Sequence, residues 1–233
     1  MSTENPPTVP GLVDDNLLSE MERSFTAFIQ LLQSKSKVVE HPDDLPPGVP
    51  TPQAGMFWLG FKSPLGETKM SDRGKVQFSF FDAVACHGRP HAHKMEGARI
   101  TQQTFRKDDL YLTLKDTESK WPEYSIRVGI DILFWLPEKE QFATYFFYGS
   151  AQDAGVQCYR RRLGSEKPTF LRITSNYVKW KRGDFWAPIV SMSSESSLEP
   201  PAKDAFDRAV KSFLDQVPKI EEPSEVPDDG IDR

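Results

Sequence analysis

The chain has 233 residues, of which 38% are hydrophobic and 27% are charged, so it can bury a sizeable core. No apolar run approaches the ~18 residues of a transmembrane helix, and the polar, proline-rich start does not resemble a secretory signal, so no membrane association is expected. The two cysteines, Cys86 and Cys158, lie far apart, which argues against a disulfide framework and favours a reducing, cytoplasmic compartment.

Charge is distributed unevenly around the total of −5. Residues 1–55 carry a net charge of −5, residues 56–194 carry +6 and residues 195–233 carry −6. A basic middle between acidic ends is typical of a nucleic-acid partner combined with an acidic tail. The alternative interpretation is an ordinary solvated surface on which charge varies along the chain.

Residues 1–55 are predicted to contain a disordered start, one amphipathic helix and a proline-rich linker. Apolar residues recur at helical spacing from Leu17 to Leu32, which predicts a helix with one apolar face. Residues 41–52 contain five prolines, a composition typical of a semi-rigid linker.

A β-rich domain is predicted over residues 56–194. The clearest strand is 125–136, where every second residue is a large apolar one. Its link to the next strand is short and polar, which predicts a hairpin. Further strands are predicted at 56–62, 75–84, 98–105, 110–115, 141–148, 169–181 and 184–193.

Two helices and a tail complete the predicted organisation. Residues 150–163 are predicted to form a helix inserted between strands, with Gly164 as its end. Residues 195–217 contain a second amphipathic helix, and residues 218–233 form an acidic segment that is expected to stay disordered. The two terminal helices would either pack on the β domain or join two subunits, so a homodimer is an open alternative.

The order of these elements predicts a mainly β protein of the α+β class. Several strands, one helix and two more strands agree with an OB-like β-barrel core, to which an N-terminal and a C-terminal helix are added. OB barrels bind oligonucleotides on one face and on its loops.

Residues 176–186 hold four aromatic and three basic side chains in a predicted hairpin. Binding of single-stranded nucleic acid needs this mixture, because cations follow the phosphates while flat rings stack on unpaired bases. The alternative is a hairpin with buried aromatics and solvated lysines. The predicted nucleic-acid-binding residues are Arg73, Lys75, Arg127, Arg160, Arg161, Arg162, Tyr177, Lys179, Trp180, Lys181, Arg182 and Phe185.

A basic, aromatic β core followed by a flexible acidic C-terminus resembles the OB-fold single-stranded DNA-binding proteins of bacteria and their phages. The resemblance covers residues 125–233 in architecture. It implies a non-enzymatic protein that binds single-stranded DNA without sequence preference during replication and recombination, in the host cytoplasm if the protein is phage-encoded. It also implies a tail that recruits replication or recombination proteins or competes with DNA. The tail residues concerned are Glu221, Glu222, Glu225, Asp228, Asp229, Ile231 and Asp232.

The final residue departs from the family's pattern. Bacterial members end their acidic tail with an apolar residue, whereas this chain ends with Arg233, and only Ile231 could take that part.

Two other function classes stay open. Cys86, His87, His91 and His93 fall within eight residues and carry the side chains that bind zinc, so a zinc site or a metal-dependent enzyme is one alternative to a polar loop without a cofactor. The chain has no phosphate-binding loop, dinucleotide fingerprint or nucleophile elbow, which argues against enzymes of those kinds. The other alternative is a non-enzymatic assembly or protein-interaction module, such as a phage component.

Overall fold

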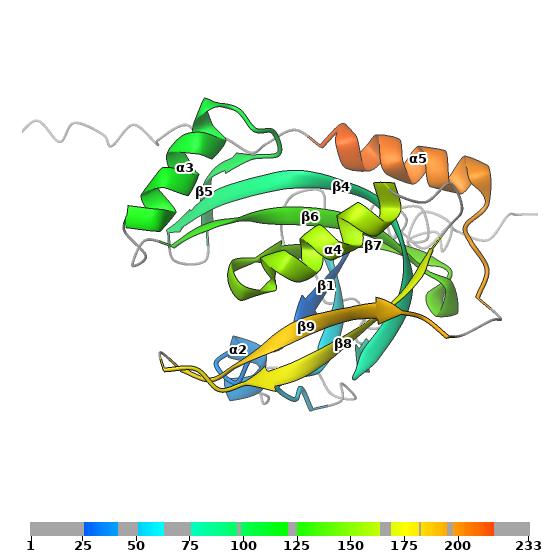
Figure 1. Cartoon of the computed structure of the whole chain (residues 1–233), viewed down its shortest axis with the longest axis horizontal. Helices are drawn as coiled ribbons and strands as arrows, with labels where there is room; N and C mark the ends of the chain where they lie inside the picture. Colours follow the sequence, from blue (N-terminus) through cyan, green and yellow to red (C-terminus); the bar gives the residue numbers. More distant parts are fainter. Residues whose placement is uncertain are drawn as a thin grey trace, which may run out of the picture.

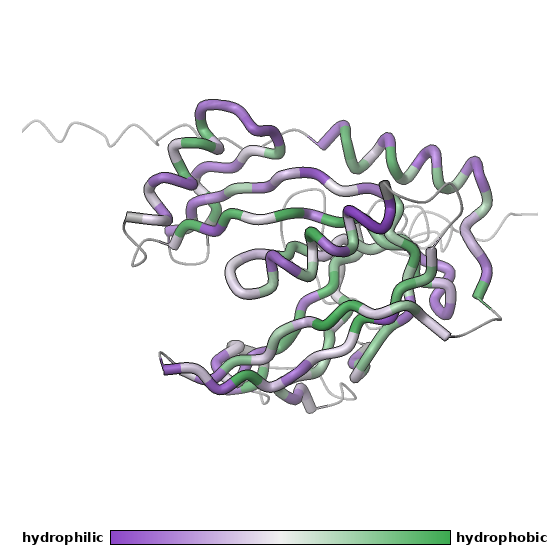
Figure 2. Tube along the Cα trace, viewed as in Figure 1, coloured by the Kyte–Doolittle hydropathy of each residue, from purple (hydrophilic) through white to green (hydrophobic). Residues whose placement is uncertain are grey.

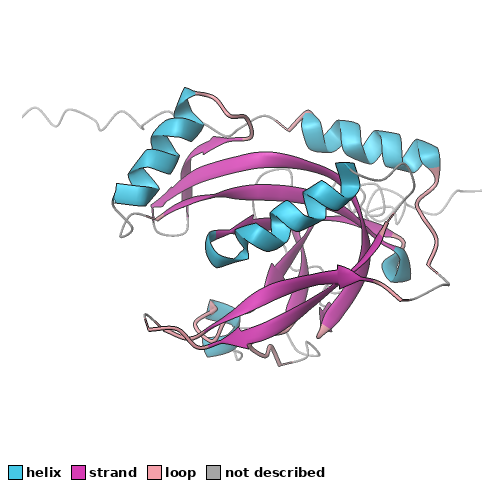
Figure 3. Cartoon of the chain, viewed as in Figure 1, coloured by secondary structure: helices cyan, strands magenta, loops and turns pink. Residues whose placement is uncertain are grey.

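A computed structural model describes residues 26–41, 51–62, 76–96, 99–120, 125–163, 169–181, 183–194 and 198–216. Within these residues nine strands form one sheet, with helices on both of its faces (Figures 1 and 3). The strands are β1 (Thr26–Leu31), β2 (Phe57–Lys62), β3 (Val76–Phe78), β4 (Phe80–Glu96), β5 (Arg99–Thr104), β6 (Ile126–Leu136), β7 (Gln141–Tyr148), β8 (Phe170–Val178) and β9 (Phe185–Met192). The helices are α2 (Lys37–Glu40), α3 (Asp109–Lys120), α4 (Gln152–Leu163) and α5 (Lys203–Leu214), and single 3₁₀ turns occupy Pro137–Lys139 and Gly149–Ala151.

The sheet is open and mixed. Its strands follow the order β3-β2-β1-β7-β6-β4-β8-β9, with β5 added to β4. All pairs are antiparallel except β1 with β7. The predicted hairpins β6–β7 and β8–β9 are both present. The predicted α+β, mainly β class is therefore confirmed.

Strand β4 is 17 residues long and connects the β8–β9 hairpin to β6 and the strands beyond it. Its first part pairs with β8, and the rest pairs with β6 and then also with β5. The interpretation of residues 86–93 as a polar loop is wrong, since each residue from His87 to His93 has a partner on β6. The register shifts at Cys86, where an extra residue in β4 forms a bulge that bends the strand.

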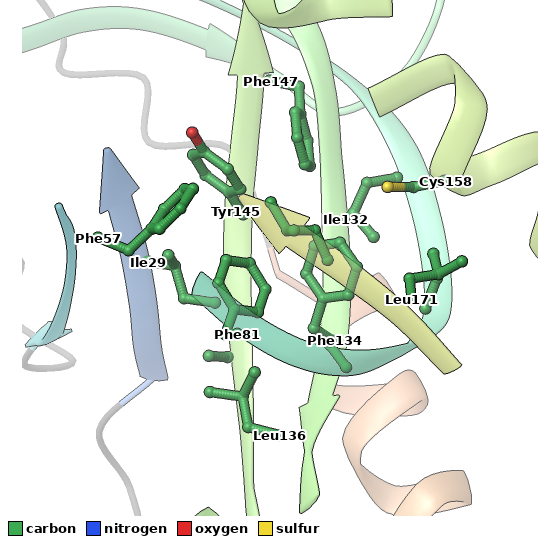
Figure 4. Packing of buried hydrophobic residues seen from close by; sticks show 14 of the residues in the cluster. Ile29, Phe57, Phe81, Ile132, Phe134, Leu136, Tyr145, Phe147, Cys158 and Leu171 are labelled. Carbon is green, nitrogen blue, oxygen red and sulfur yellow. The ribbon is translucent and has the colours of Figure 1, made fainter. Parts of the chain in front are cut away.

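The main core lies in the hollow of the sheet, around α4. In Figure 1, α4 lies between β4 and β6 on one side and β8 and β9 on the other. Figure 4 shows rings from β2, β4, β6 and β7 packed together, with Cys158 of α4 at their edge. Phe57, Phe134 and Phe147 are fully buried there, and Phe81 meets Phe57 edge-on at 5.1 Å between ring centroids. This packing confirms the predicted helix at 150–163 as a core element.

Helix α3 corrects the predicted strand at 110–115. The Tyr111 N–H donates to the carboxylate of Asp108 at 2.9 Å, so Asp108 caps the start of the helix. Tyr111 and Leu114 lie three residues apart and pack on a small cluster that includes Val128 of β6. Because side chains alternate along a strand, Val128 and Ile132 share one face of β6, and α3 therefore covers the same face of the sheet as α4.

Strand β1 corrects the C-terminal half of the predicted N-terminal helix. Residues 26–31 lie between β2 and β7, with Ala27, Ile29 and Leu31 buried in the core. Hydrogen bonding to two neighbouring strands and alternate burial favour the extended conformation over the helix. The sheet thus includes a segment that precedes the predicted domain start at residue 56. Residues 17–25 of the predicted helix, and most of the predicted linker, lie outside the described residues.

Helix α5 confirms the predicted C-terminal helix and covers the face of the sheet opposite α4. Figure 2 shows hydrophilic and hydrophobic residues alternating along it, as expected of a helix with one buried side. Phe213 is 2% exposed and packs with Val84 and Cys86 of β4 and Leu133 of β6. The helix therefore packs on the sheet of its own chain.

Candidate functional site

The tip of the β8–β9 hairpin displays the aromatic and basic residues predicted to bind nucleic acid. Tyr177 is 43% exposed and Trp180 is 59% exposed, and Lys179 and Lys181 on either side of Trp180 are also exposed. Phe185, at the start of β9, is half-buried. In Figure 1 the tip extends away from the rest of the sheet, at the lower left of the view.

The conformation of the tip follows from its local sequence. Gly183 has a φ of 129°, which a residue with a side chain rarely adopts, and its N–H donates to the Trp180 carbonyl at 3.1 Å. At the base of the tip the rings of Tyr177 and Trp186 lie 5.3 Å apart at their centroids. The chain therefore turns sharply after Trp180, and the contact between the Tyr177 and Trp186 rings joins β8 to β9 at the base of the turn.

Asp184 moderates the positive charge of the tip. The hydroxyl of Tyr177 donates to the Asp184 carboxylate at 2.7 Å, and this hydrogen bond raises the pKa of Tyr177 above its usual range. Tyr177 is therefore a neutral ring at physiological pH. It can stack on a base without adding negative charge near a phosphate.

The other predicted cations do not join this surface. Arg160, Arg161 and Arg162 end helix α4, which Figure 1 places on the side of the molecule away from the hairpin tip. The Arg162 Nε donates to the Cys86 carbonyl at 3.2 Å, so this guanidinium satisfies a backbone carbonyl at the β4 bulge. Arg127 lies on β6, with its guanidinium 4.9 Å from the centre of the Tyr148 ring.

Three predicted cations and the tail lie outside the described residues. Arg73 and Lys75 precede β3, and Arg182 lies within the hairpin turn. The predicted tail residues all fall in the segment 217–233, which is also outside. Their proposed roles stay predictions from the sequence.

The predicted metal ligands separate into two pairs. Cys86 and His87 lie at the bulge of β4, and the buried Cys86 thiol donates to the Val84 carbonyl at 3.5 Å. Burial raises the pKa of Cys86 to about 12, so a thiolate ligand would be costly to form there. His91 and His93 lie further along β4, with ring centroids 4.9 Å apart. Within the described residues no three His, Cys, Asp or Glu side chains are arranged to hold a metal ion.

A buried polar cluster surrounds these two histidines on the face that α5 covers. We define it as Arg89, His91 and His93 of β4 with Asp131 of β6, all between 5% and 7% exposed. Asp131 Oδ2 lies 3.4 Å from Arg89 Nη2 and 3.3 Å from His91 Nδ1. The cluster thus holds an opposite-charge pair and two imidazoles in an environment from which water is largely excluded.

Helix α5 and two phenylalanines close over the cluster. Arg89 also donates to the Phe213 carbonyl and to the Gln216 side chain at the end of α5. Its guanidinium lies 3.6 Å from the centre of the Phe105 ring, and Phe146 lies 4.2 Å from the His91 ring. Neither Arg89 nor Asp131 was predicted from the sequence as a site residue. An aspartate in the middle of the most apolar predicted strand was the available signal, since a buried carboxylate requires a partner.

His87 predicts a pH dependence of stability. Burial lowers the pKa of His87 below its usual value of 6.5, so the unfolded chain binds a proton more readily than the folded one. Stability contributed by neutral His87 is present above pH 6.5 and is lost as the pH falls below that value. Replacing His87 by Gln should reduce proton uptake on unfolding between pH 7 and pH 5 by up to about one proton per chain.

The measurement is chemical denaturation of wild-type and His87→Gln protein at several pH values. His41→Gln is the control, because His41 is exposed and distant along the chain. If the free energy of unfolding of His87→Gln changed with pH as much as that of the wild type, the lowered pKa of His87 would be contradicted.

Comparison with known proteins adds no relative: no family model, curated protein or solved structure matches this chain. Among the described helices, none combines the length and apolar character needed to cross a membrane. The class that fold and site define is an α+β protein with an open mixed sheet and an exposed aromatic-basic hairpin.

Proposed function

We propose that this protein binds single-stranded DNA without sequence preference through the tip of the β8–β9 hairpin. The observation that supports the proposal is Trp180, which is 59% exposed between two exposed lysines, with Tyr177 beside them. A tryptophan side chain is usually largely buried, so the exposure of Trp180 at a basic tip favours a role in binding. Every base has a flat face, so stacking on such rings tolerates any sequence.

The proposed interface is smaller than the one expected from the sequence. Lys179 and Lys181 would contact phosphates, while Tyr177, Trp180 and the half-buried edge of Phe185 would meet bases. Of the predicted OB-like mode of binding, the proposal retains the use of a loop that joins two strands. Arg160, Arg161 and Arg162 would act only on a longer strand, because they lie away from the tip (Figure 1).

The acidic segment 218–233 has a proposed regulatory role. Six acidic residues there would compete with DNA for the basic tip and would recruit replication or recombination proteins. Deleting 218–233 should therefore tighten DNA binding. DNA binding itself would need neither catalysis nor a cofactor and would take place in the cytoplasm.

The test is a titration of fluorescent oligo-dT with full-length protein at several salt concentrations. Trp180→Ala should weaken binding by about 5- to 150-fold, since stacking contributes about 1–3 kcal/mol per base. The double variant Lys179→Ala/Lys181→Ala should lower the slope of log K against log salt by about 1.4, as each phosphate contact contributes about 0.7.

Matched controls separate the tip from general charge. Lys115 and Lys139 are exposed lysines on α3 and after β6, and replacing both by Ala should leave the salt slope nearly unchanged. Absence of binding at low salt, with and without residues 218–233, would refute the proposal. So would equal affinity of wild-type and Trp180→Ala protein.

A second candidate, an assembly module, is favoured by the position of β9 at one edge of the sheet, where the Gln33 side chain hydrogen-bonds the N–H and C=O of Trp186 near one end of the strand. Among the described strands β9 pairs only with β8, and Ile189 and Met192 on it are 46% and 58% exposed. An exposed edge strand with apolar side chains is suited to pairing with another chain. Concentration-dependent association that Ile189→Lys abolishes, together with no DNA binding, would favour this candidate.

A further inference from the structure

Two polar side chains on the face of the sheet that α5 covers lie close to one atom, the Nε2 of His91. His93 Nδ1 lies 3.1 Å from it and the amide of Gln103 on β5 lies 2.9 Å from it. His91 and His93 are two residues apart on β4, so both point to the same face, and Gln103 is paired with His93 across the β4–β5 ladder. The three groups are therefore positioned by backbone pairing.

The carboxylate of Asp131 lies beside the other ring nitrogen of His91, Nδ1. Its Oδ2 lies 3.3 Å from His91 Nδ1, without the alignment of a hydrogen bond. The carboxylate would hold the tautomer that has its proton on Nδ1, in which the Nε2 lone pair is available to a metal ion. Histidines that bind metals commonly have this arrangement, with the second ring nitrogen beside a carboxylate.

We propose that His91 Nε2, His93 Nδ1 and the Gln103 side-chain oxygen bind a divalent transition-metal ion, with Asp131 orienting His91. Two ligands about 2.0–2.1 Å from a metal ion lie about 2.9–3.4 Å apart, and the separations of 2.9 and 3.1 Å fall in this range. The amide of Gln103 must present its oxygen, and the two ends of an amide exchange by a simple flip. Because the third donor is the amide of Gln103, the proposed site contains only two side chains of the His, Cys, Asp and Glu types.

The surroundings predict which ions bind and how tightly. Imidazole nitrogens favour copper, nickel and zinc over magnesium and calcium. Phe105 and Phe146 pack against the His91 ring and keep the site dry. The guanidinium of Arg89 opposes a second cation, although Asp131 compensates part of its charge. We therefore expect moderate affinity, with copper binding more tightly than zinc.

The test measures binding of Cu²⁺, Ni²⁺ and Zn²⁺ to the full-length protein by calorimetry and by metal analysis after dialysis. We expect one ion per chain and at least a tenfold loss of affinity in His93→Gln and in Gln103→Leu, with circular dichroism showing that both variants are folded. His91→Gln should abolish binding. If that variant does not fold, the other two carry the test.

Two control variants use the remaining histidines of the chain. His41→Gln and His87→Gln should bind the metal as the wild type does, because His41 is exposed and His87 faces Phe213 of α5. Absence of a bound ion at millimolar metal, or equal affinity of wild type, His93→Gln and Gln103→Leu, would overturn the proposal. This result is independent of DNA binding, since the hairpin tip shares no residue with the site.

Discussion

Replacing Arg89 by Met should lower the free energy of unfolding by about 3–5 kcal/mol, because it leaves the buried carboxylate of Asp131 without its guanidinium partner. Arg89 is 6% exposed and Asp131 is 7% exposed, so water cannot take over the role of the lost charge. The same substitution removes the bonds from Arg89 to Phe213 and Gln216 at the end of α5. Urea denaturation followed by circular dichroism measures the loss.

A double variant distinguishes the unpaired charge from lost packing. In Arg89→Met/Asp131→Leu no charge is left alone, so we expect much of the lost stability to return, as buried ion pairs can be replaced by apolar residues of similar volume. Arg208→Met on the exposed side of α5 is the control and should change stability by less than about 0.5 kcal/mol. A loss below about 1 kcal/mol in Arg89→Met would show that the pair is better solvated than the structure indicates.

Elements with strong local signals were predictable from the sequence. The alternation in β6 and the apolar line of α4 each have one interpretation, and both elements lie within one or two residues of the predicted bounds. Residues 110–115 alternate in the same way, yet they form α3. Asp108 was the missed signal, because a capping aspartate before Tyr111 indicates the start of a helix.

Strand β1 depends on contacts that no local pattern contains. Phe28, Ile29 and Leu32 fit helical spacing, while Ala27, Ile29 and Leu31 fit alternation, so a segment this short satisfies both periods. Its conformation is decided by β2, about 30 residues later in the chain, and by β7, over 100 residues later. The pairing of β1 with β2 and β7 therefore could not be predicted from the sequence of β1 alone.

The candidate sites differ in the same respect. The hairpin tip is local, since all its residues fall within a segment of about ten, and its composition alone identified it. The buried polar cluster joins β4 to Asp131, 42 residues after Arg89, and to α5, 124 residues after Arg89. The sequence therefore identified His91 and His93 as candidates. It did not indicate that Gln103, Asp131 and helix α5 lie beside them.

Replacing Phe213 by Ala should cost about 3–5 kcal/mol, because it empties the centre of the contact between α5 and the sheet. The ring is 2% exposed, packs with Val84 and Leu133, and lies 4.1 Å from the Arg89 guanidinium at its centre. Denaturation measures the loss, and hydrogen exchange should show faster exchange in α5 than in the core strands. Leu214, the next residue, is 48% exposed, and Leu214→Ala should cost less than about 1 kcal/mol.

The same variant decides between the two roles that the sequence left open for the terminal helix. If α5 stabilises its own chain, the loss caused by Phe213→Ala is independent of protein concentration. If α5 instead packed between subunits, the apparent stability of the wild type would rise with concentration and the variant would lose that dependence. Since Phe213 contacts β4 and β6 of its own chain, we expect the first result. Equal losses in Phe213→Ala and Leu214→Ala would contradict the packing of α5 described above.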